Sequence, residues 1–212
     1  MNIKYSIYPT LLDSFYWYKR FPDTKFSELI DKINRVKTPM PIAALKGIQF
    51  EKCVNDCING IVLEKKGKEV VTENFYFNND LIYKIANKLK NAKTKQEFIS
   101  GIVKTKFGLV KVYGFVDYSF PEMYVDLKTT SMYKIGKYKI NNQHKAYSLI
   151  AKVNGNPIKE FNYLVTDFTR FFIETYKCTE KLHQEFITEL EDFIDFLEYH
   201  KELITDKTIF KP

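Results

Sequence analysis

The sequence has few of the residues from which cross-links and metal clusters are built. Its 212 residues include three cysteines, Cys53, Cys57 and Cys178, too few for a disulfide framework or a four-thiolate iron–sulfur cluster. Cys53 and Cys57 are one helical turn apart, and we interpret them as small buried apolar residues. The three histidines lack the spacing of a zinc site. We therefore expect a reduced, cytoplasmic protein without zinc or an iron–sulfur cluster.

Long apolar runs are also missing. None approaches the ~18 residues that a membrane-spanning helix requires, so we expect no membrane partner. The N-terminal stretch lacks the small-residue cleavage site of a secretory signal, which favours an intracellular protein. There is no repeat, low-complexity tract or Gly/Ser linker at which to place a domain boundary, so we expect a single domain over residues 1–212.

Arginine is scarce although the chain is basic. The formal net charge is +7, and only Arg20, Arg35 and Arg170 among the 33 basic residues are arginines. Lysine is a compact charge suited to phosphate, whereas the arginine fork reads base edges. The composition therefore favours sequence-independent contact with nucleic acid. AT-rich coding DNA also produces lysine-rich proteins and is the alternative explanation.

The residue patterns that are present predict a mixed α/β layout. Helices are predicted over 9–20, 42–60, 80–92, 141–155 and 179–204, and strands over 69–77, 108–118, 123–130, 160–168 and 170–178. Asp80 is the expected N-cap of the third helix, and 21–41 is interpreted as a polar, proline-bounded segment. This order predicts an α/β fold with a mixed central β-sheet flanked by helices, the first and last of them packed on the core.

The segment Gly114–Thr130 predicts a hairpin with unusual charges. Asp126 and Lys128 alternate with apolar residues, so both point to one face of their strand. Pairing of the two strands brings Asp117 close to Asp126, and two close carboxylates repel unless a cation lies between them. Lys128 and a divalent metal ion are the candidate counter-charges.

Glu51 adds a third carboxylate. It interrupts the inward face of the helix predicted over 42–60, and buried carboxylates are rarely left unpaired. Three carboxylates and a lysine form a donor set suited to Mg²⁺ or Mn²⁺. The alternative is an ordinary salt bridge between Lys128 and one aspartate at a solvated sheet edge, which would leave the other inward charges to be explained separately.

These residues resemble the RecB-like branch of the PD-(D/E)XK nuclease superfamily. The branch has a helical glutamate followed by G-x-x-D, (D/E)-x-K and Q-x-x-x-Y motifs, matched here by Glu51, Gly114 with Asp117, Asp126 with Lys128, and Gln143 with Tyr147. The resemblance covers roughly Ala43 to Ser148, and the aromatic N-terminal segment is also similar. The sequence departs from the pattern at Gln49, where a histidine precedes the glutamate in the branch.

The resemblance implies a restriction-endonuclease-like core and metal-dependent hydrolysis of DNA phosphodiester bonds. A Mg²⁺ or Mn²⁺ ion would be held by Asp117, Asp126, the backbone carbonyl of Leu127, and Glu51. Lys128 would orient the attacking water and offset charge on the phosphate. The number of metal ions stays open.

Two further residues have both a functional and a structural interpretation. In the resemblance, Gln143 and Tyr147 position the active site and the DNA backbone. The alternative is a polar residue at a helix start and a buried tyrosine. We expect His144, between them, to be an exposed helix residue.

The resemblance also implies a role as an exonuclease in phage or bacterial DNA recombination or processing. DNA and a single-strand annealing or recombination protein are the expected partners. Two alternatives remain: a catalytically inactive nuclease-fold DNA-binding module, and an interaction protein that docks a partner through its long C-terminal helix. Exonuclease against endonuclease action, cleavage polarity, strand preference and oligomeric state stay open.

Overall fold

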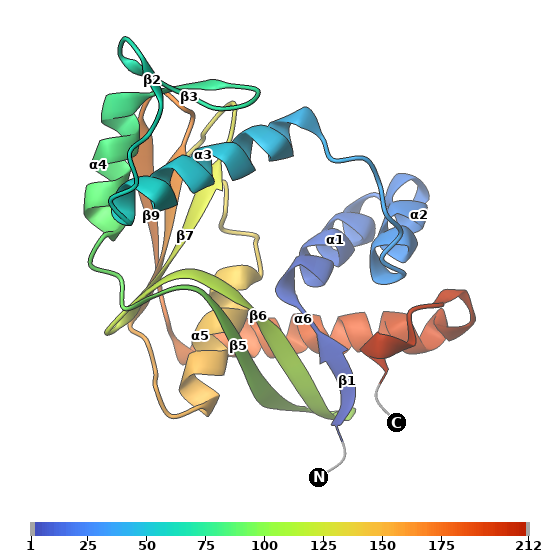
Figure 1. Ribbon diagram of the computed structural model, residues 1–212. Helices are drawn as coiled ribbons and strands as arrows, with labels where there is room; N and C mark the ends of the chain where they lie inside the picture. The colour runs from blue at the N-terminus through green and yellow to red at the C-terminus, as the bar shows by residue number, and fades with distance from the viewer. Residues whose placement is uncertain (1–2, 211–212) are drawn as a thin grey trace.

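The computed structural model describes residues 3–210 and has helices on both sides of a mixed sheet (Figure 1). The strands are β1 Ile3–Ile7, β2 Lys65–Lys66, β3 Glu69–Val71, β4 Tyr76–Asn78, β5 Thr94–Thr105, β6 Gly108–Phe120, β7 Met123–Thr129, β8 Glu160–Thr166 and β9 Phe171–Lys177. The helices are α1 Pro9–Arg20, α2 Pro22–Ile33, α3 Ile42–Ile58, α4 Asn79–Leu89, α5 Gln143–Val153 and α6 Glu180–Tyr199, with short 3₁₀ helices Lys201–Leu203 and Lys207–Ile209. Across residues 3–210, no helix has the length and apolar character needed to span a membrane.

The main sheet has an opening beside β6. Within residues 3–210 its strand order is β1-β6-β7-β8-β9, and β5 pairs with the other edge of β6. β1 is parallel to β6 and β7 to β8, while the remaining neighbours are antiparallel. β1 pairs with Leu109–Val112 and β7 with Tyr118–Phe120 of the same edge. Residues 113–117 of β6 lie between these two pairings, and Asp117 is among them.

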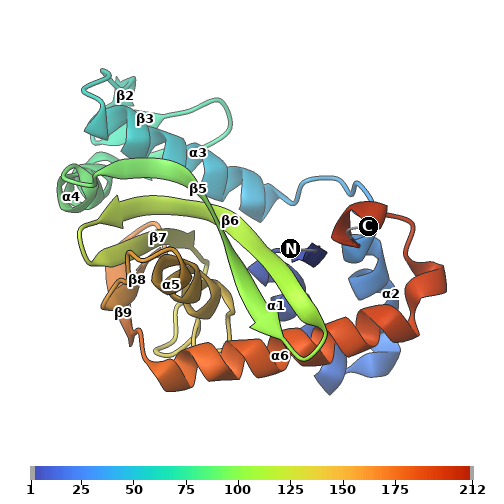
Figure 2. The ribbon, with the colours of Figure 1, turned by 90° about the horizontal axis from the view of Figure 1, so that it is seen from below.

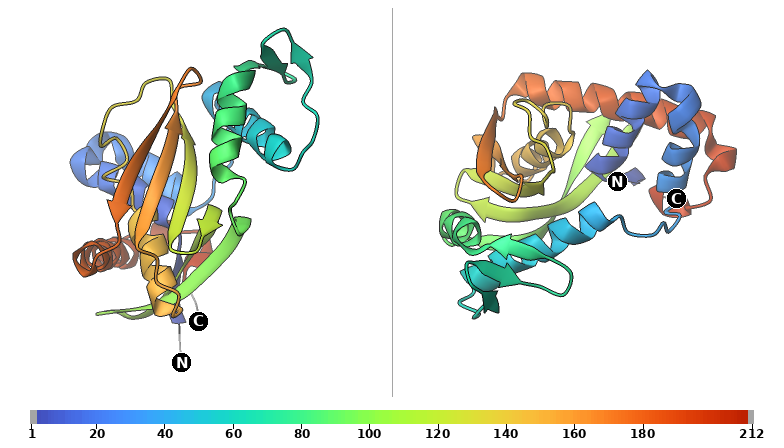
Figure 3. Two further views of the ribbon diagram at one scale, coloured as in Figure 1. Left: turned by 90° about the vertical axis from the view of Figure 1, so that its left-hand side faces the viewer. Right: turned by 90° about the horizontal axis from the view of Figure 1, so that it is seen from above.

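Two hydrophobic cores lie on opposite faces of the sheet. One joins α1, α5 and α6 to the sheet and includes Ile150 and Phe193. The other joins α3 and α4 to the sheet and includes Phe50, Val125 and Leu127. The two groups of helices are on either side of the strands in Figure 3. The expected α/β fold with a mixed central sheet flanked by helices is therefore confirmed.

Several expected elements differ from those observed. The segment 21–41, expected to be polar and bounded by prolines, contains the helix α2. Pro22 does not prevent this helix, since it is the first helical residue, a position that a proline tolerates. The strand expected over 69–77 is instead two strands, β3 and β4, joined by a turn. Asn78 rather than Asp80 caps α4, accepting a hydrogen bond from the N–H of Leu81 at 2.9 Å. Neither β1 nor β5 was predicted.

Candidate active site

Glu51 is carried to the sheet by α3. Phe50 and Val54 anchor the helix in the core, and the neighbouring Glu51 is half-buried. A Cβ at Gly47 would approach Oγ1 of Thr129 to 2.6 Å. The glycine therefore allows α3 to lie close to β7, one turn before Glu51.

Asp117 lies where β6 and β7 separate. Their pairing ends at Tyr118 and Val125, one residue before Asp117 would face Asp126. The N–H of Leu127 donates to Oδ2 of Asp117 at 2.9 Å instead of to a backbone carbonyl of β6. The carboxylate thus takes over the ladder hydrogen bond at the point of divergence, which holds β7 next to it.

Gln96 on β5 bridges two of the three carboxylates. Its Nε2 donates to Oε1 of Glu51 at 2.8 Å and to Oδ1 of Asp117 at 3.2 Å. Gln96 has a φ of 50°, in the left-handed region that a residue with a side chain rarely adopts. The cross-strand register between β5 and β6 also omits the Gln96–Asp117 pair. Gln96 was not among the predicted site residues, because β5 itself was not predicted.

Asp126 and Lys128 form an ion pair on the neighbouring strand. Nζ of Lys128 lies 2.7 Å from Oδ2 of Asp126. The same Nζ donates to Oε1 of Gln143 at 2.9 Å, and Nε2 of Gln143 donates to Oδ1 of Asp126. Asp126 is only 2% exposed, so an ordinary ion pair at a solvated sheet edge does not describe this arrangement.

Burial and like charge dominate the electrostatics. Burial, together with the charges of Asp126 and Glu51, raises the pKa of Asp117 to about 8. Burial and Asp126 also raise the pKa of Glu51. Burial lowers the pKa of Lys128, but Asp126 and Asp117 outweigh it and hold the pKa above its ordinary value. The site therefore holds a persistent ammonium beside carboxyl groups that resist ionisation together.

Tyr147 supports the site from α5. It is buried, and its hydroxyl accepts a hydrogen bond from the N–H of Phe115 at 3.1 Å, in the opening beside β6. Gly114 leaves room for the ring. Gln143 is also buried and contacts Asp126 and Lys128, so it lies closer to the candidate chemistry than Tyr147 does.

His144 does not have the position expected from the sequence. It is 1% exposed, so the expectation of an exposed helix residue was wrong. Its ring is stacked on Tyr176 with centroids 4.2 Å apart, and Nδ1 lies 3.1 Å from the hydroxyl of Tyr163. Aromatic neighbours thus cover the polar ring.

Gln49 is turned away from the carboxylates, and its Oε1 accepts a hydrogen bond from the hydroxyl of Thr72 at 2.6 Å.

The donor chemistry suits a hard divalent cation, but the side chains are not arranged around one. Within residues 3–210, no three His, Cys, Asp or Glu side chains are grouped as ligands of one ion. Glu51 and Asp117 converge on Gln96, whereas Asp126 faces Lys128 and Gln143. A cation would offset the repulsion that raises the pKa of Glu51 and Asp117, in competition with the Gln96 amide. The carboxylate ligands are thus of the type that Mg²⁺ or Mn²⁺ binds, although the side chains do not surround one point.

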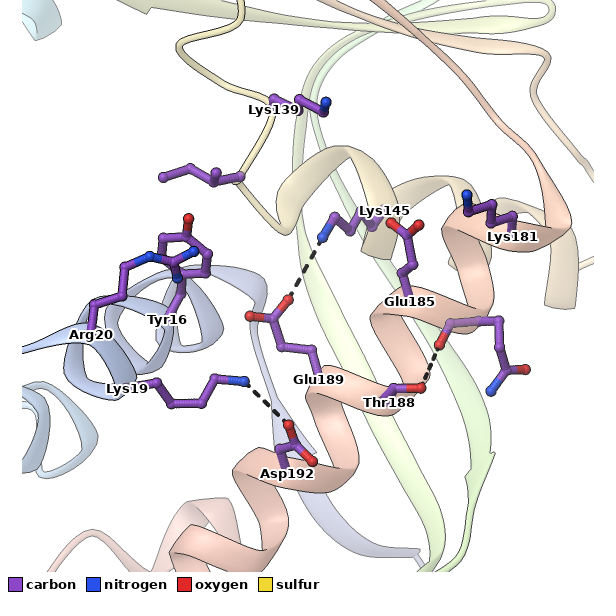
Figure 4. Close-up of a pocket in the computed structure, with 12 residues that line it drawn as sticks. Tyr16, Lys19, Arg20, Lys139, Lys145, Lys181, Glu185, Thr188, Glu189 and Asp192 are labelled. Carbon is purple, nitrogen blue, oxygen red and sulfur yellow. Dashed lines mark hydrogen bonds and ion pairs between the residues drawn. The ribbon is translucent and has the colours of Figure 1, made fainter.

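A large, open cavity lies away from these carboxylates. It encloses about 790 Å³ between α1, α6 and the segment leading into α5. Figure 4 shows that its cations are partly matched by acids: Lys19 faces Asp192 at 3.2 Å, and Lys145 faces Glu189 at 3.7 Å. Five cationic and three acidic side chains line this cavity, so it has an excess of positive charge. The carboxylate cluster contains the residues that match the sequence motifs, and it is the stronger candidate for catalysis.

Comparisons with known proteins concern the fold. No protein-family model and no curated protein matches the sequence. The crystal structure of SSO0001 is similar, with a TM-score of 0.54 and 12% identity over 92% of this chain and 78% of the other. A presumed exonuclease from Eubacterium rectale is also similar, with a TM-score of 0.52 and 16% identity over 82% of this chain and 73% of the other. The chain therefore shares its α/β fold with these two proteins.

Proposed function

We propose that the protein is a Mg²⁺- or Mn²⁺-dependent deoxyribonuclease of the RecB-like branch of the PD-(D/E)XK superfamily. The observation that carries the proposal is that Glu51 and Asp117 lie within charge-interaction range of the Asp126–Lys128 ion pair, at the divergence of β6 and β7. Buried groups with strongly shifted pKa values are typical of catalytic sites. The motif order in the sequence and the nuclease-like fold support the same function.

The residues have distinct roles in this proposal. Asp117, Asp126, Glu51 and the Leu127 carbonyl are the groups that would hold the metal. The ion would acidify a bound water and stabilise charge on the phosphate. Lys128 has three ammonium donors, and those not engaged by Gln143 and Asp126 remain for a water or a phosphate oxygen. Gln143 fixes the direction of this ammonium, as electrostatic preorganisation requires.

An exonuclease acting in phage or bacterial DNA recombination or processing is the finer form of the proposal. It rests on the sequence resemblance, as does a single-strand annealing or recombination protein as partner. A catalytically inactive DNA-binding module with the same fold is the second candidate, because Asp126 is paired with Lys128 rather than directed at the other carboxylates.

Cleavage of end-labelled linear and closed-circular DNA tests these possibilities together. With Mg²⁺ we expect loss of linear DNA from its ends, no loss with EDTA, and no loss with Asp117→Asn. Cutting of closed circles would instead establish an endonuclease. DNA binding without cleavage in Mg²⁺ or Mn²⁺ would support the inactive module and reject the enzyme.

A further inference from the structure

One face of the β5–β6 pair bears large exposed side chains. The register places Phe98 opposite Phe115, Ser100 opposite Tyr113 and Ile102 opposite Lys111. α5 covers the other face of the pair, because a Cβ at Gly101 would meet Ile150 and one at Gly114 would meet Tyr147. Figures 1 and 2 show α5 on that side. Phe98 and Phe115 therefore point away from this core.

Four rings form a continuous series, which we call the aromatic face: Tyr8, Tyr113, Phe98 and Phe115. The ring centroids of Phe98 and Phe115 are 5.3 Å apart, those of Phe98 and Tyr113 are 6.2 Å apart, and those of Tyr113 and Tyr8 are 5.8 Å apart. Phe98 is 50% exposed and Phe115 is 53% exposed. Adjacent exposed apolar side chains of this size commonly mark a binding surface.

Cations accompany these rings. Nζ of Lys111 lies 5.9 Å from the ring centre of Phe98. Arg35 donates to the hydroxyl of Tyr113 at 3.2 Å and lies 6.0 Å from the ring centre of Tyr8. Its charge is shared with Asp206, at 2.6 Å, so Lys111 is the less committed of the two cations. Aromatic rings combined with basic side chains complement the bases and phosphates of a single strand.

The aromatic face continues into the carboxylate site. Asp117 follows Phe115 by two residues on β6, and Gln96 of β5 donates a hydrogen bond to Asp117 at 3.2 Å. Residues two apart on a strand share a face and are separated by about 7 Å. A chain lying along the rings would therefore lead directly to Asp117 and Gln96.

We propose that the aromatic face binds an unpaired DNA strand by stacking its bases, and that this strand enters the carboxylate site. The proposal names the substrate form of the proposed nuclease, and the entry of the strand into the carboxylate site rests on that proposed function. Bases inside a duplex stack on one another, whereas unpaired bases present their faces to aromatic side chains. The structure thus favours single-stranded DNA, or a frayed end, at this site.

Equilibrium binding of a fluorescent oligo-dT strand in EDTA tests the stacking without any cleavage. We expect Phe98→Ala and Phe115→Ala each to weaken binding at least about fivefold, since stacking on an aromatic side chain is worth ~1–3 kcal/mol per base. Phe21→Ala is the matched control, because Phe21 is 52% exposed and also stacked, on Trp17. It should leave the affinity unchanged.

A direct readout uses Phe98→Trp in a Trp17→Phe background, which leaves a single tryptophan. Oligo-dT should quench its fluorescence, and a blunt duplex should quench it much less. Thermal melts establish that each variant is folded. Unchanged oligo-dT affinity in folded Phe98→Ala and Phe115→Ala would overturn the proposal. The proposal would also be overturned if Phe98→Ala and Phe115→Ala abolished self-association or binding of another protein while the affinity for oligo-dT stayed unchanged.

The same measurements separate this proposal from the nuclease function. Ring-dependent binding of oligo-dT by a protein that cuts no DNA with Mg²⁺ or Mn²⁺ would keep the aromatic face as a strand-binding site and reject the enzyme. Cleavage with ring-independent binding would keep the enzyme and reject the aromatic face.

Discussion

The ring of Tyr147 occupies the space beside Gly114 in which any other residue would place its Cβ. The Tyr147 hydroxyl accepts the N–H of the next residue, Phe115, at 3.1 Å. The helix α5 is thus fixed to β6 three residues before Asp117. The glycine of the G-x-x-D motif and the tyrosine of the Q-x-x-x-Y motif are therefore packed against each other in this chain.

Gly114→Ala should therefore destabilise the protein. Forcing extra atoms into a packed core typically costs about 1–3 kcal/mol, and here the neighbour is a large ring. The cost should be smaller in a Tyr147→Ala background, where the ring is absent. Urea unfolding of the four proteins in this cycle measures the coupling. Strictly additive free energies would show that the two residues do not constrain each other.

The sequence predicted the charges of the hairpin better than their surroundings. Alternation along β7 placed Asp126 and Lys128 on one face because that signal is local. β5 was not predicted because it has apolar residues on both faces, which hides the period of two: Phe98, Ile99, Ile102 and Val103.

The role of Gln96 had no local signal. Its partners, Glu51 and Asp117, are 45 and 21 residues away in the chain, and a glutamine gives no indication of a left-handed backbone. His144 was misplaced for a related reason. Its polar ring is buried because aromatic side chains of β8 and β9, among them Tyr163 and Tyr176, provide its neighbours.

Asp117→Asn should stabilise the metal-free protein at neutral and alkaline pH. The folded-state pKa of Asp117 is raised from 3.8 to about 8, so its favourable protonated form is fully present below pH 4 and is lost as pH rises through 8. The neutral amide avoids this loss. Melting temperatures measured from pH 4 to 9 should therefore diverge in favour of the variant.

Divalent metal should reverse the order of stability. Mg²⁺ or Mn²⁺ should raise the melting temperature of the wild-type protein, because binding to the folded state stabilises it, and should raise that of Asp117→Asn far less. Identical shifts in both proteins would mean that the ion binds elsewhere.

His144 should make the protein sensitive to acid. Burial lowers the folded-state pKa of His144 from 6.5 to about 3. The neutral ring therefore contributes stability above pH 6.5 that is lost as pH falls from 6.5 towards 3. Replacement by a group that does not titrate, as in His144→Gln, should flatten the dependence of the unfolding free energy on pH in this range. His200→Gln is the control, because His200 is less buried and should change the slope less. Equal slopes in wild type and His144→Gln would contradict the assignment.

DNA affinity should fall steeply with salt. Lysine–phosphate contacts release condensed counterions, so the logarithm of the binding constant should fall linearly with the logarithm of salt concentration. The scarcity of arginine predicts little dependence on base sequence. Titrations of two unrelated DNA sequences at several salt concentrations measure both effects. A salt-independent affinity would count against phosphate contacts as the source of binding.

Lys128 should separate catalysis from folding. Because Asp126 is 2% exposed, Lys128→Ala leaves a buried carboxylate unpaired and should cost more stability than an exposed ion pair would. Lys128→Arg keeps the positive charge and is the better variant for kinetics. Its planar fork cannot take the position of a compact ammonium held by Asp126 and Gln143. We expect folded Lys128→Arg to bind DNA nearly as tightly as the wild-type protein does. It should cut DNA at least ~10²-fold more slowly, since the lost ammonium stabilises charge that develops only in the transition state. Lys52→Ala, which removes the partner of Asp56 on the outer side of α3, is the control and should cut at the wild-type rate. Wild-type cleavage by Lys128→Arg and by Lys128→Ala, measured below their melting temperatures, would mean that the ion pair is structural and that the chemistry lies elsewhere.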